Sequence, residues 1–161
     1  MAEAGARPHA DVRSAGDGFL LRAWRQEDLA ALLRHADDPQ VPRGLSDRFP
    51  HPYTRADGEA CGGIAVRPHA GERAHGAELG YWLGRQHWGR GHMTRVVAAY
   101  LGWVVPTLQL VRVEANVLDT NPASARVLEK NGFVEEGCRR AAIRKPDGLH
   151  DVRLFGRVWP G

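Results

Sequence analysis

A stretch rich in glycine and arginine, RQHWGRGHMT at residues 85–94, has the composition to hold an anion. It follows a run with strand-like alternation, AELGYWLG, and precedes a segment with helical periodicity, so its glycines lie at the start of a helix. The first N–H groups of a helix lack intrahelical partners and carry partial positive charge, and glycine lets an anion approach them closely. Spacing alone predicts a phosphate-like anion site, with a tight turn that serves only backbone geometry as the alternative.

The same stretch lacks the marks of two common nucleotide-binding loops. No Gly-Lys-Ser/Thr follows its glycines, which excludes a Walker A loop, and the G-x-G-x-x-G spacing of the dinucleotide fingerprint is absent. No metal site is predicted, because the eight histidines are scattered and have no cysteine partner at ligand spacing. The two cysteines, Cys61 and Cys138, predict no disulfide framework and fit the reducing cytoplasm.

The elements that must position this stretch follow from hydrophobic periodicity. Apolar residues recur at helical spacing from Met93 to Pro106, and strict alternation over 110–117 indicates a strand. Asn121 as N-cap, with Pro122 after it and Asn131-Gly132 at the end, is typical of a helix. The other expected elements are strands at 19–24, 61–68 and 77–84, a helix at 26–38 with Leu29, Leu32, Leu33 and Ala36 on one face, a loop-like segment at 38–60, and a C-terminal hairpin around the turn PDGL.

The order of these elements, β-α-β-β-α-β-α-β-β, predicts an α/β fold of the α+β kind, with a mixed sheet and helices on its faces. A flexible leader is expected at 1–18, and a single domain at 19–161. No apolar run is long enough to span a membrane, and the leader has no signal-peptide h-region. The net charge of +3, without a basic stripe or a Lys/Arg-rich block, makes a nucleic-acid-binding module the weakest hypothesis.

Two motifs, in order along the chain, resemble those of a known family. The first is AELGYWLGRQHWGRGHMT, and the second, downstream, is NPASARVLEKNGF. Together they resemble the GCN5-related N-acetyltransferase (GNAT) superfamily, most of all its RimJ/RimL-like branch of ribosomal-protein N-terminal acetyltransferases. The resemblance covers about residues 19–159. It implies the GNAT acyl-CoA N-acyltransferase fold, in which two central parallel strands, here 77–83 and 110–117, splay apart to admit acetyl-CoA.

By this resemblance, the anion at the helix start is the pyrophosphate of acetyl-CoA, used as a co-substrate without a metal. The residues implied in its binding come from the end of the splayed strand, the glycine stretch and the start of the next helix. They are Trp82, Leu83, Gln86, Gly89, Arg90, Gly91, His92, Met93, Thr94 and Asn121.

The chemistry implied by the resemblance is direct attack of a primary amine on a thioester, in a ternary complex. Glu78 is the first candidate for the base and Glu114 the second, and ordinary charged roles on a strand are the alternatives. Ser124 lies where the family has a hydroxyl near the CoA sulfur, so it is the candidate proton donor to the leaving thiolate. Its alternative role is helix capping. A strand N–H can hold the oxyanion, and positioning can supply most of the acceleration.

One segment departs from the family pattern. About 20–25 residues are absent between the first helix and the strand that contains GGI, judged against the usual length of such elements. The second strand and second helix of the family are therefore expected to be missing or reduced. Segment 41–62 would then leave the acceptor site open to a bulky amine, completed by the partner of a homodimer, or inactive.

The predicted function is acetyl-CoA-dependent N-acetylation of a primary amine in the cytoplasm. A protein N-terminal α-amine is the first candidate for the acceptor, and a small-molecule amine is the second. A catalytically silent acyl-CoA-binding or regulatory module is the alternative from a different functional class.

Overall fold

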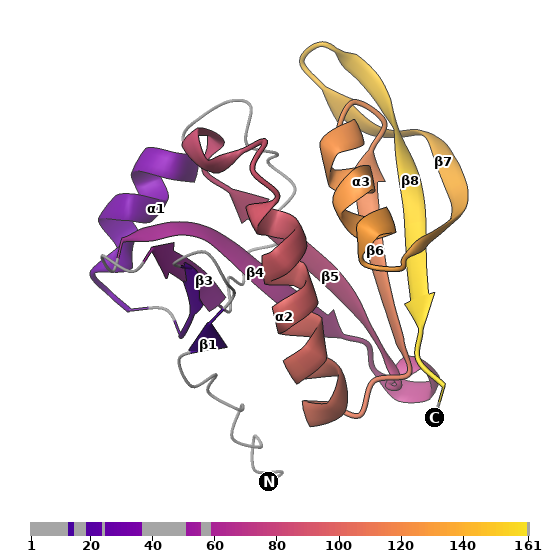
Figure 1. Cartoon of the computed structure of the whole chain (residues 1–161). Coiled ribbons are helices and arrows are strands. Elements are labelled where there is room, and N and C mark those ends of the chain that lie inside the picture. The colour runs from indigo at the N-terminus through magenta and orange to yellow at the C-terminus, as the bar shows by residue number, and fades with distance from the viewer. Residues whose placement is uncertain (1–12, 15–18, 24, 37–50, 56–58, 161) are drawn as a thin grey trace, which may run out of the picture.

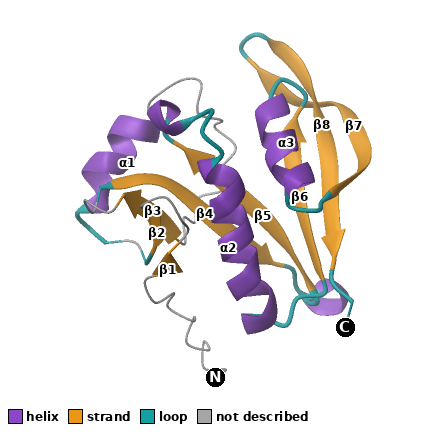
Figure 2. Cartoon of the chain, viewed as in Figure 1, coloured by secondary structure: helices purple, strands orange, loops and turns teal. Residues whose placement is uncertain are grey.

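One mixed sheet and three α-helices make up the computed structural model, which describes residues 13–14, 19–23, 25–36, 51–55 and 59–160. Within these residues eight strands pair in the order β1-β2-β3-β4-β5-β6-β8-β7. Figures 1 and 2 show α2 and α3 side by side in front of the sheet. The elements are β1 (Arg13–Ser14), β2 (Phe19–Leu21), α1 (Asp28–Ala36), β3 (His51–Arg55), β4 (Ala60–Pro68), β5 (Gly76–Leu83), α2 (His92–Thr107), β6 (Arg112–Leu118), α3 (Pro122–Lys130), β7 (Val134–Lys145) and β8 (Gly148–Val158), with 3-10 turns η1 (Gly71–Arg73) and η2 (Arg85–His87).

The strands β5 and β6 are the only parallel neighbours in the described sheet, and they pair over a short length. No β5–β6 pair follows Glu78 and Glu114 among the described residues, although the strands continue to Leu83 and Leu118. Figure 1 shows the two strands diverging from their paired end. The predicted splay of the central parallel strands is confirmed. It leaves the β6-facing backbone of β5 beyond Glu78 without a ladder partner in β6. The pairs are Gly76↔Arg112, Ala77↔Val113 and Glu78↔Glu114.

The core lies between the sheet and α2. The buried face of this helix packs with Ala77 and Leu79 of β5 and with Val113 of β6 in one cluster. The helix ends at Thr107, one residue beyond the predicted end at Pro106, because a proline in the last turn removes only a single N–H donor. This packing fixes the start of α2 relative to the diverging strands. The buried residues are those that helical spacing predicts, and Val105 in addition: Met93, Val96, Val97, Tyr100, Leu101, Val104 and Val105.

The helix α1 buries a different face from the one that its leucines predict. Leu29 and Leu33 expose 57% and 62% of their surface, whereas Asp28, Ala31 and His35 are buried. Leu32 is half-buried, and the side chain of Ala36 lies outside the described residues. The predicted apolar face is therefore wrong for its two exposed leucines.

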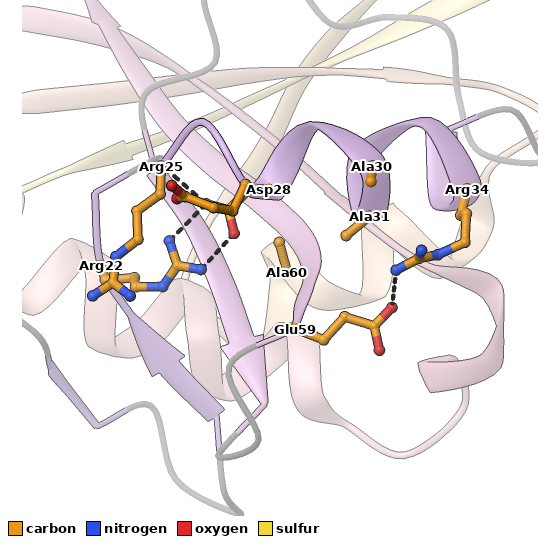
Figure 3. Close-up of a pocket in the computed structure, with 9 residues that line it drawn as sticks. Arg22, Arg25, Asp28, Ala30, Ala31, Arg34, Glu59 and Ala60 are labelled. Atoms are coloured by element: carbon orange, nitrogen blue, oxygen red, sulfur yellow. Dashed lines mark hydrogen bonds and ion pairs between the residues drawn. The ribbon is translucent and has the colours of Figure 1, made fainter.

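A buried ion pair accounts for the rotation of α1. Arg22 donates to both carboxylate oxygens of Asp28, at 2.6 and 2.5 Å, and the backbone N–H of Arg25 donates to the same carboxylate at 2.8 Å. Figure 3 shows this pair in a pocket that Arg34 and Glu59 also line. Burial raises the pKa of Asp28, but the bonds from Arg22 and Arg25 outweigh it and leave the pKa below its usual value. A buried carboxylate must be paired, so Asp28 rather than the leucines faces inward.

The segment predicted as a loop contains a strand. The residues of β3 pair antiparallel with β2 and β4, as in Phe19↔Arg55 and Tyr53↔Gly62. The loop prediction is wrong here, because backbone pairing between two neighbours builds this strand despite its proline and without hydrophobic alternation. The strand expected to be missing or reduced is present with five residues. The place of the second helix, residues 37–50, lies outside the described residues.

The two ends of the chain agree with most of the expected elements. The hairpin β7–β8 forms around the predicted turn, and its strands pair from Lys145↔Gly148 outward. The first predicted strand is shorter, with β2 ending at Leu21. Within the predicted leader only Arg13–Ser14 is described, and it forms β1 against β2. The rest of the leader lies outside the described residues.

Candidate functional site

Two glycines in the left-handed region form the loop between β5 and α2. Gly89 has a φ of +75° and Gly91 a φ of +72°, values that strongly favour glycine. Gly91 is the N-cap of α2 and contributes no side-chain cap. A Cβ placed on Gly89 would meet no described atom within 4 Å, so the loop is open to an incoming group. The start of a 16-residue helix is thus presented beside the exposed Arg85 and Arg90.

The glycine loop is held in place from two sides. Trp88 donates from Nε1 to the carbonyl of Leu83 at 2.7 Å, which ties the loop to the end of β5. Asn131, after α3, donates from Nδ2 to the carbonyl of Thr94 at 3.2 Å and to that of Val127 at 2.8 Å. These bonds fix the first turn of α2 against both the strand end and α3.

A side-chain bridge crosses from β5 to α3 where the strands diverge. The hydroxyl of Tyr81, beyond the paired part of β5, donates to the carbonyl of Ser124 at 3.1 Å and lies 2.9 Å from Ser124 Oγ. Asn121 caps α3 as predicted, by accepting the N–H of Ser124 at 3.1 Å. Burial raises the pKa of Tyr81 to about 12, although the bond with Ser124 lowers it. The Tyr81 hydroxyl therefore keeps its proton at neutral pH.

A second bridge crosses the opening from β6. Asn116 lies on β6 beyond its paired residues and donates from Nδ2 to Glu78 Oε1 at 2.9 Å. Arg67, opposite Glu78 on β4, donates to Glu78 Oε2. Side chains alternate along a strand, so Glu78 and Tyr81 project to opposite faces of β5. Glu78 is thus held at the point where the strands separate, on the face away from Ser124.

Glu114, the other candidate for the base, lies against two arginines and a histidine. It lies 2.8 Å from Arg73 Nη2, 3.0 Å from His69 Nε2 and 3.5 Å from Arg112 Nε. Burial raises the pKa of Glu114, whereas Arg73, His69 and Arg112 lower it. Their combined effect is larger than that of burial, so the pKa lies below its usual value. A carboxylate held in this way is a weak proton acceptor near neutral pH. Its surroundings favour the alternative, a charged partner of arginine, although the two arginines come from η1 and from β6 itself rather than from across the sheet.

The family follows from comparison with known proteins. Residues 53–134, just over half of the chain, match a family described as "Acetyltransferase (GNAT) domain". The chain belongs to the GNAT family. The matched range contains the glycine loop, both diverging strands and α3, and it confirms the resemblance drawn from the two motifs.

Curated relatives match part of this GNAT chain. It is 34% identical over 82 residues to the ribosomal-protein-serine acetyltransferase of Escherichia coli (strain K12), which covers 51% of the chain and 46% of the relative. It is 31% identical over 108 residues to the putative ribosomal N-acetyltransferase YdaF of Bacillus subtilis (strain 168), which covers 65% and 58%. The chain spans about half the length of the curated relatives it matches.

Solved GNAT structures share the fold over a longer range. The ribosomal-protein-S5-alanine acetyltransferase of Vibrio fischeri superposes with a TM-score of 0.77 at 18% identity, over 92% of this chain and 97% of that one. Mycobacterium smegmatis RimJ in complex with CoA-disulfide superposes with a TM-score of 0.71 at 24% identity, over 87% and 81%. These likenesses confirm the GNAT fold.

The predicted co-substrate residues of this GNAT chain occupy two settings. The Trp82 side chain is 2% exposed and packs against Gly63, so this residue can offer a ligand mainly its backbone. The carbonyl of the next residue, Leu83, already accepts a hydrogen bond from Trp88. Their role in binding stays a prediction, as does that of Asn121. The others gather around the start of α2, and their roles stay predictions too: Gln86, Gly89, Arg90, Gly91, His92, Met93 and Thr94.

Sequence reasoning missed the contacts of three site residues of this GNAT chain. It placed Tyr81 on the same strand face as Leu79 and Leu83, as core or pocket lining, and Asn116 only on the polar face of its strand. Asn131 was taken only as a helix end. Their partners lie 43, 38 and 37 residues away in the chain. Alternation alone could have indicated that Tyr81 faces the helices, because it shares a face with Leu79 and Leu83.

Two other classes of feature are not found in the described part of the chain. No helix there combines the length and the apolar character that crossing a bilayer requires. Nor do three His, Cys, Asp or Glu side chains gather there in a group that could hold a metal ion.

Proposed function

We propose that this GNAT chain is an N-acetyltransferase that transfers the acetyl group of acetyl-CoA to a primary amine. The observation that carries the proposal is the open glycine loop at the end of β5, which follows the part of β5 that no longer pairs with β6. An anion at the start of α2 and an extended polar chain along β5 would both find backbone donors and acceptors there.

The described residues fit acetyl-CoA as a co-substrate. A Cβ at Gly89 would project into open space, which is the room that a pyrophosphate needs, and the backbone around Gly91 would face it with N–H groups. Acetyl-CoA would supply an activated thioester and a thiolate leaving group. The residues proposed to hold it are Trp82, Leu83, Gln86, Gly89, Arg90, Gly91, His92, Met93, Thr94 and Asn121.

The chain supplies a candidate proton acceptor and a candidate donor on opposite faces of β5. Glu78 takes a proton from the amine, directly or through a water, while Arg67 and Asn116 hold its carboxylate in place. Ser124 gives a proton to the leaving sulfur on the other face and regains one from solvent, while Glu78 releases to solvent the proton that it took from the amine. One proton therefore leaves the nitrogen and one reaches the sulfur, with no covalent enzyme intermediate.

A protein N-terminal α-amine is the acceptor that we propose first. The support comes from the relatives, among them the ribosomal-protein-serine acetyltransferase, and from the RimJ-like fold. A small-molecule amine is the second choice. An assembly as a homodimer and a place in the cytoplasm stay predictions.

A silent acyl-CoA-binding module is the competing function, and one observation favours it. Both oxygens of Glu78 already accept bonds, from Arg67 and Asn116, which makes this carboxylate a less available base. Binding of acetyl-CoA without transfer would then be the whole activity.

A thermal shift followed by a transfer assay separates these functions. A ligand that binds only the folded chain raises the melting temperature, so acetyl-CoA and CoA are tested first. Release of free thiol is then followed with peptides that begin with serine or alanine, with the same peptides acetylated at the N-terminus as matched controls, and with small amines. We expect stabilisation by acetyl-CoA and thiol release only with free α-amines.

The other outcomes assign the alternatives. Stabilisation without thiol release on any acceptor supports the silent module. Release with small amines alone supports the second choice of acceptor. Absence of stabilisation by both acetyl-CoA and CoA contradicts the proposal.

A further inference from the structure

The Tyr81–Ser124 bridge has two possible patterns of hydrogen bonding. Tyr81 has one hydroxyl proton and two acceptors on the same residue, the Ser124 carbonyl at 3.1 Å and Ser124 Oγ at 2.9 Å. When the Tyr81 proton points to the carbonyl, the Ser124 hydroxyl can donate back to Tyr81. When the Tyr81 proton points to Oγ, the Ser124 proton is released toward a third acceptor.

In both patterns the Tyr81 proton has an acceptor on Ser124. Both acceptors are within hydrogen-bond distance, so only the hydrogen of Tyr81 must rotate. Burial keeps the pKa of Tyr81 at about 12, so the proton needed for either pattern is present at neutral pH. Asn121 holds the Ser124 backbone meanwhile through its bond to the Ser124 N–H. A negative charge near Ser124 would favour the pattern in which both hydroxyls donate along one chain.

We propose that Tyr81 is a positioning residue for the leaving group: it donates to Ser124 Oγ and so directs the Ser124 proton to a thiolate between the diverging strands. The inference rests on the proposed function. No O–H bond needs to break for this effect, since two hydrogen bonds in series stabilise the sulfur anion until it is protonated. The position of Tyr81, just past the last β5–β6 pair, is what brings its ring across to α3.

The competing explanation is that the bridge only fastens α3 to β5. Tyr100 provides a matched control for that explanation. Tyr100 lies on α2 and is buried, and burial raises its pKa to about 12 as well. Its hydroxyl accepts the N–H of Val66, on β4, at 3.2 Å. Tyr81→Phe and Tyr100→Phe therefore each remove one hydrogen-bonded hydroxyl, the first from the half-buried ring beside α3 and the second from a buried ring that bonds to β4.

The test titrates the thiol of CoA bound to the full chain, by the ultraviolet absorbance of the thiolate. The ligand-free protein is subtracted to remove the signals of Cys61 and Cys138. Two donors in series favour the anion, so we expect the pKa of the bound thiol to lie about one pH unit below that of free CoA. Tyr81→Phe should remove roughly half of that difference, with CoA affinity changed by less than about threefold. Tyr100→Phe should leave the thiol pKa unchanged.

A double-substitution cycle completes the test. Ser124→Ala should abolish the difference, and Tyr81→Phe with Ser124→Ala should match Ser124→Ala alone, because Tyr81 acts through Ser124. If Tyr81→Phe does not fold, Ser124→Ala still reports on the same chain of bonds: a bound thiol as acidic as in the wild type overturns the inference. A bound-thiol pKa in folded Tyr81→Phe that equals the wild-type value also overturns the inference. Additive effects of the two substitutions on the thiol pKa overturn it as well. Lack of CoA binding by the wild type instead overturns the proposed function, and this inference with it.

Discussion

The two ends of the β5–β6 pair are built in opposite ways. At the paired end, called the closed end below, Ala77 and Val113 are fully buried, and Glu114 lies against Arg73, Arg112 and His69. At the splayed end, called the open end below, β5 no longer pairs with β6, and side-chain bridges from Tyr81 and Asn116 cross the opening. The closed end holds the strands rigidly, so the open end can present unpaired backbone without losing its geometry.

The largest expected effect comes from a change at the open end, in the glycine loop. Gly89→Asp should weaken acetyl-CoA binding by about 100-fold or more, about 2.8 kcal/mol, because a carboxylate would enter the space proposed for the pyrophosphate. Titration calorimetry measures the loss.

The control for this change lies near the closed end. Gly71 has a φ of +63° and equally open surroundings, so Gly71→Asp adds the same charge and similar backbone strain away from the loop. It should keep wild-type affinity, and Gly89→Ala should isolate the strain alone. Wild-type affinity in Gly89→Asp would refute the placement of the anion.

An intermediate effect is expected at the junction between the two ends. Glu78→Gln should lower kcat for thiol release by roughly 100-fold, because a neutral amide cannot take the proton of the amine. The affinity for acetyl-CoA should stay within about threefold of the wild type, since Glu78 lies on the face of β5 away from Ser124. Initial rates and calorimetry separate the two quantities.

Glu114 serves as the matched control for Glu78, since the two residues are register partners on β6 and β5. Glu114→Gln should keep most of the activity. If Glu114→Gln loses as much kcat as Glu78→Gln, or more, the assignment of the base to Glu78 is wrong.

The smallest effect is a pH dependence at the closed end. The pKa of Glu114 lies below its usual value of 4.5 because Arg73, His69 and Arg112 outweigh the effect of burial. Its ionised form therefore stabilises the fold above about pH 4.5, and this contribution fades as the pH falls through the lowered pKa. Glu114→Gln should cost about 0.5–1 kcal/mol at pH 7 and progressively less in acid. Urea unfolding at several pH values checks this, and a gap that widens in acid would contradict it.

Periodic and local signals predicted the open end well, except where contacts are remote in sequence. The spacing in α2 and the cap at Asn121 are local features, and both were found. The rotation of α1 was missed because one buried pair, Arg22–Asp28, overrides the leucine spacing. The partner of Tyr81 was missed because a bond across 43 residues depends on the strand register, which alternation does not specify.

Hydrogen–deuterium exchange with and without acetyl-CoA tests the central claim most directly. If the open end is the site of acetyl-CoA, the ligand should slow exchange at residues 79–83 and 89–94. The paired residues 76–78 and 112–114 should exchange as before, because their backbone is already closed by the ladder. Protection at the paired end, or no protection at either end, would contradict the account.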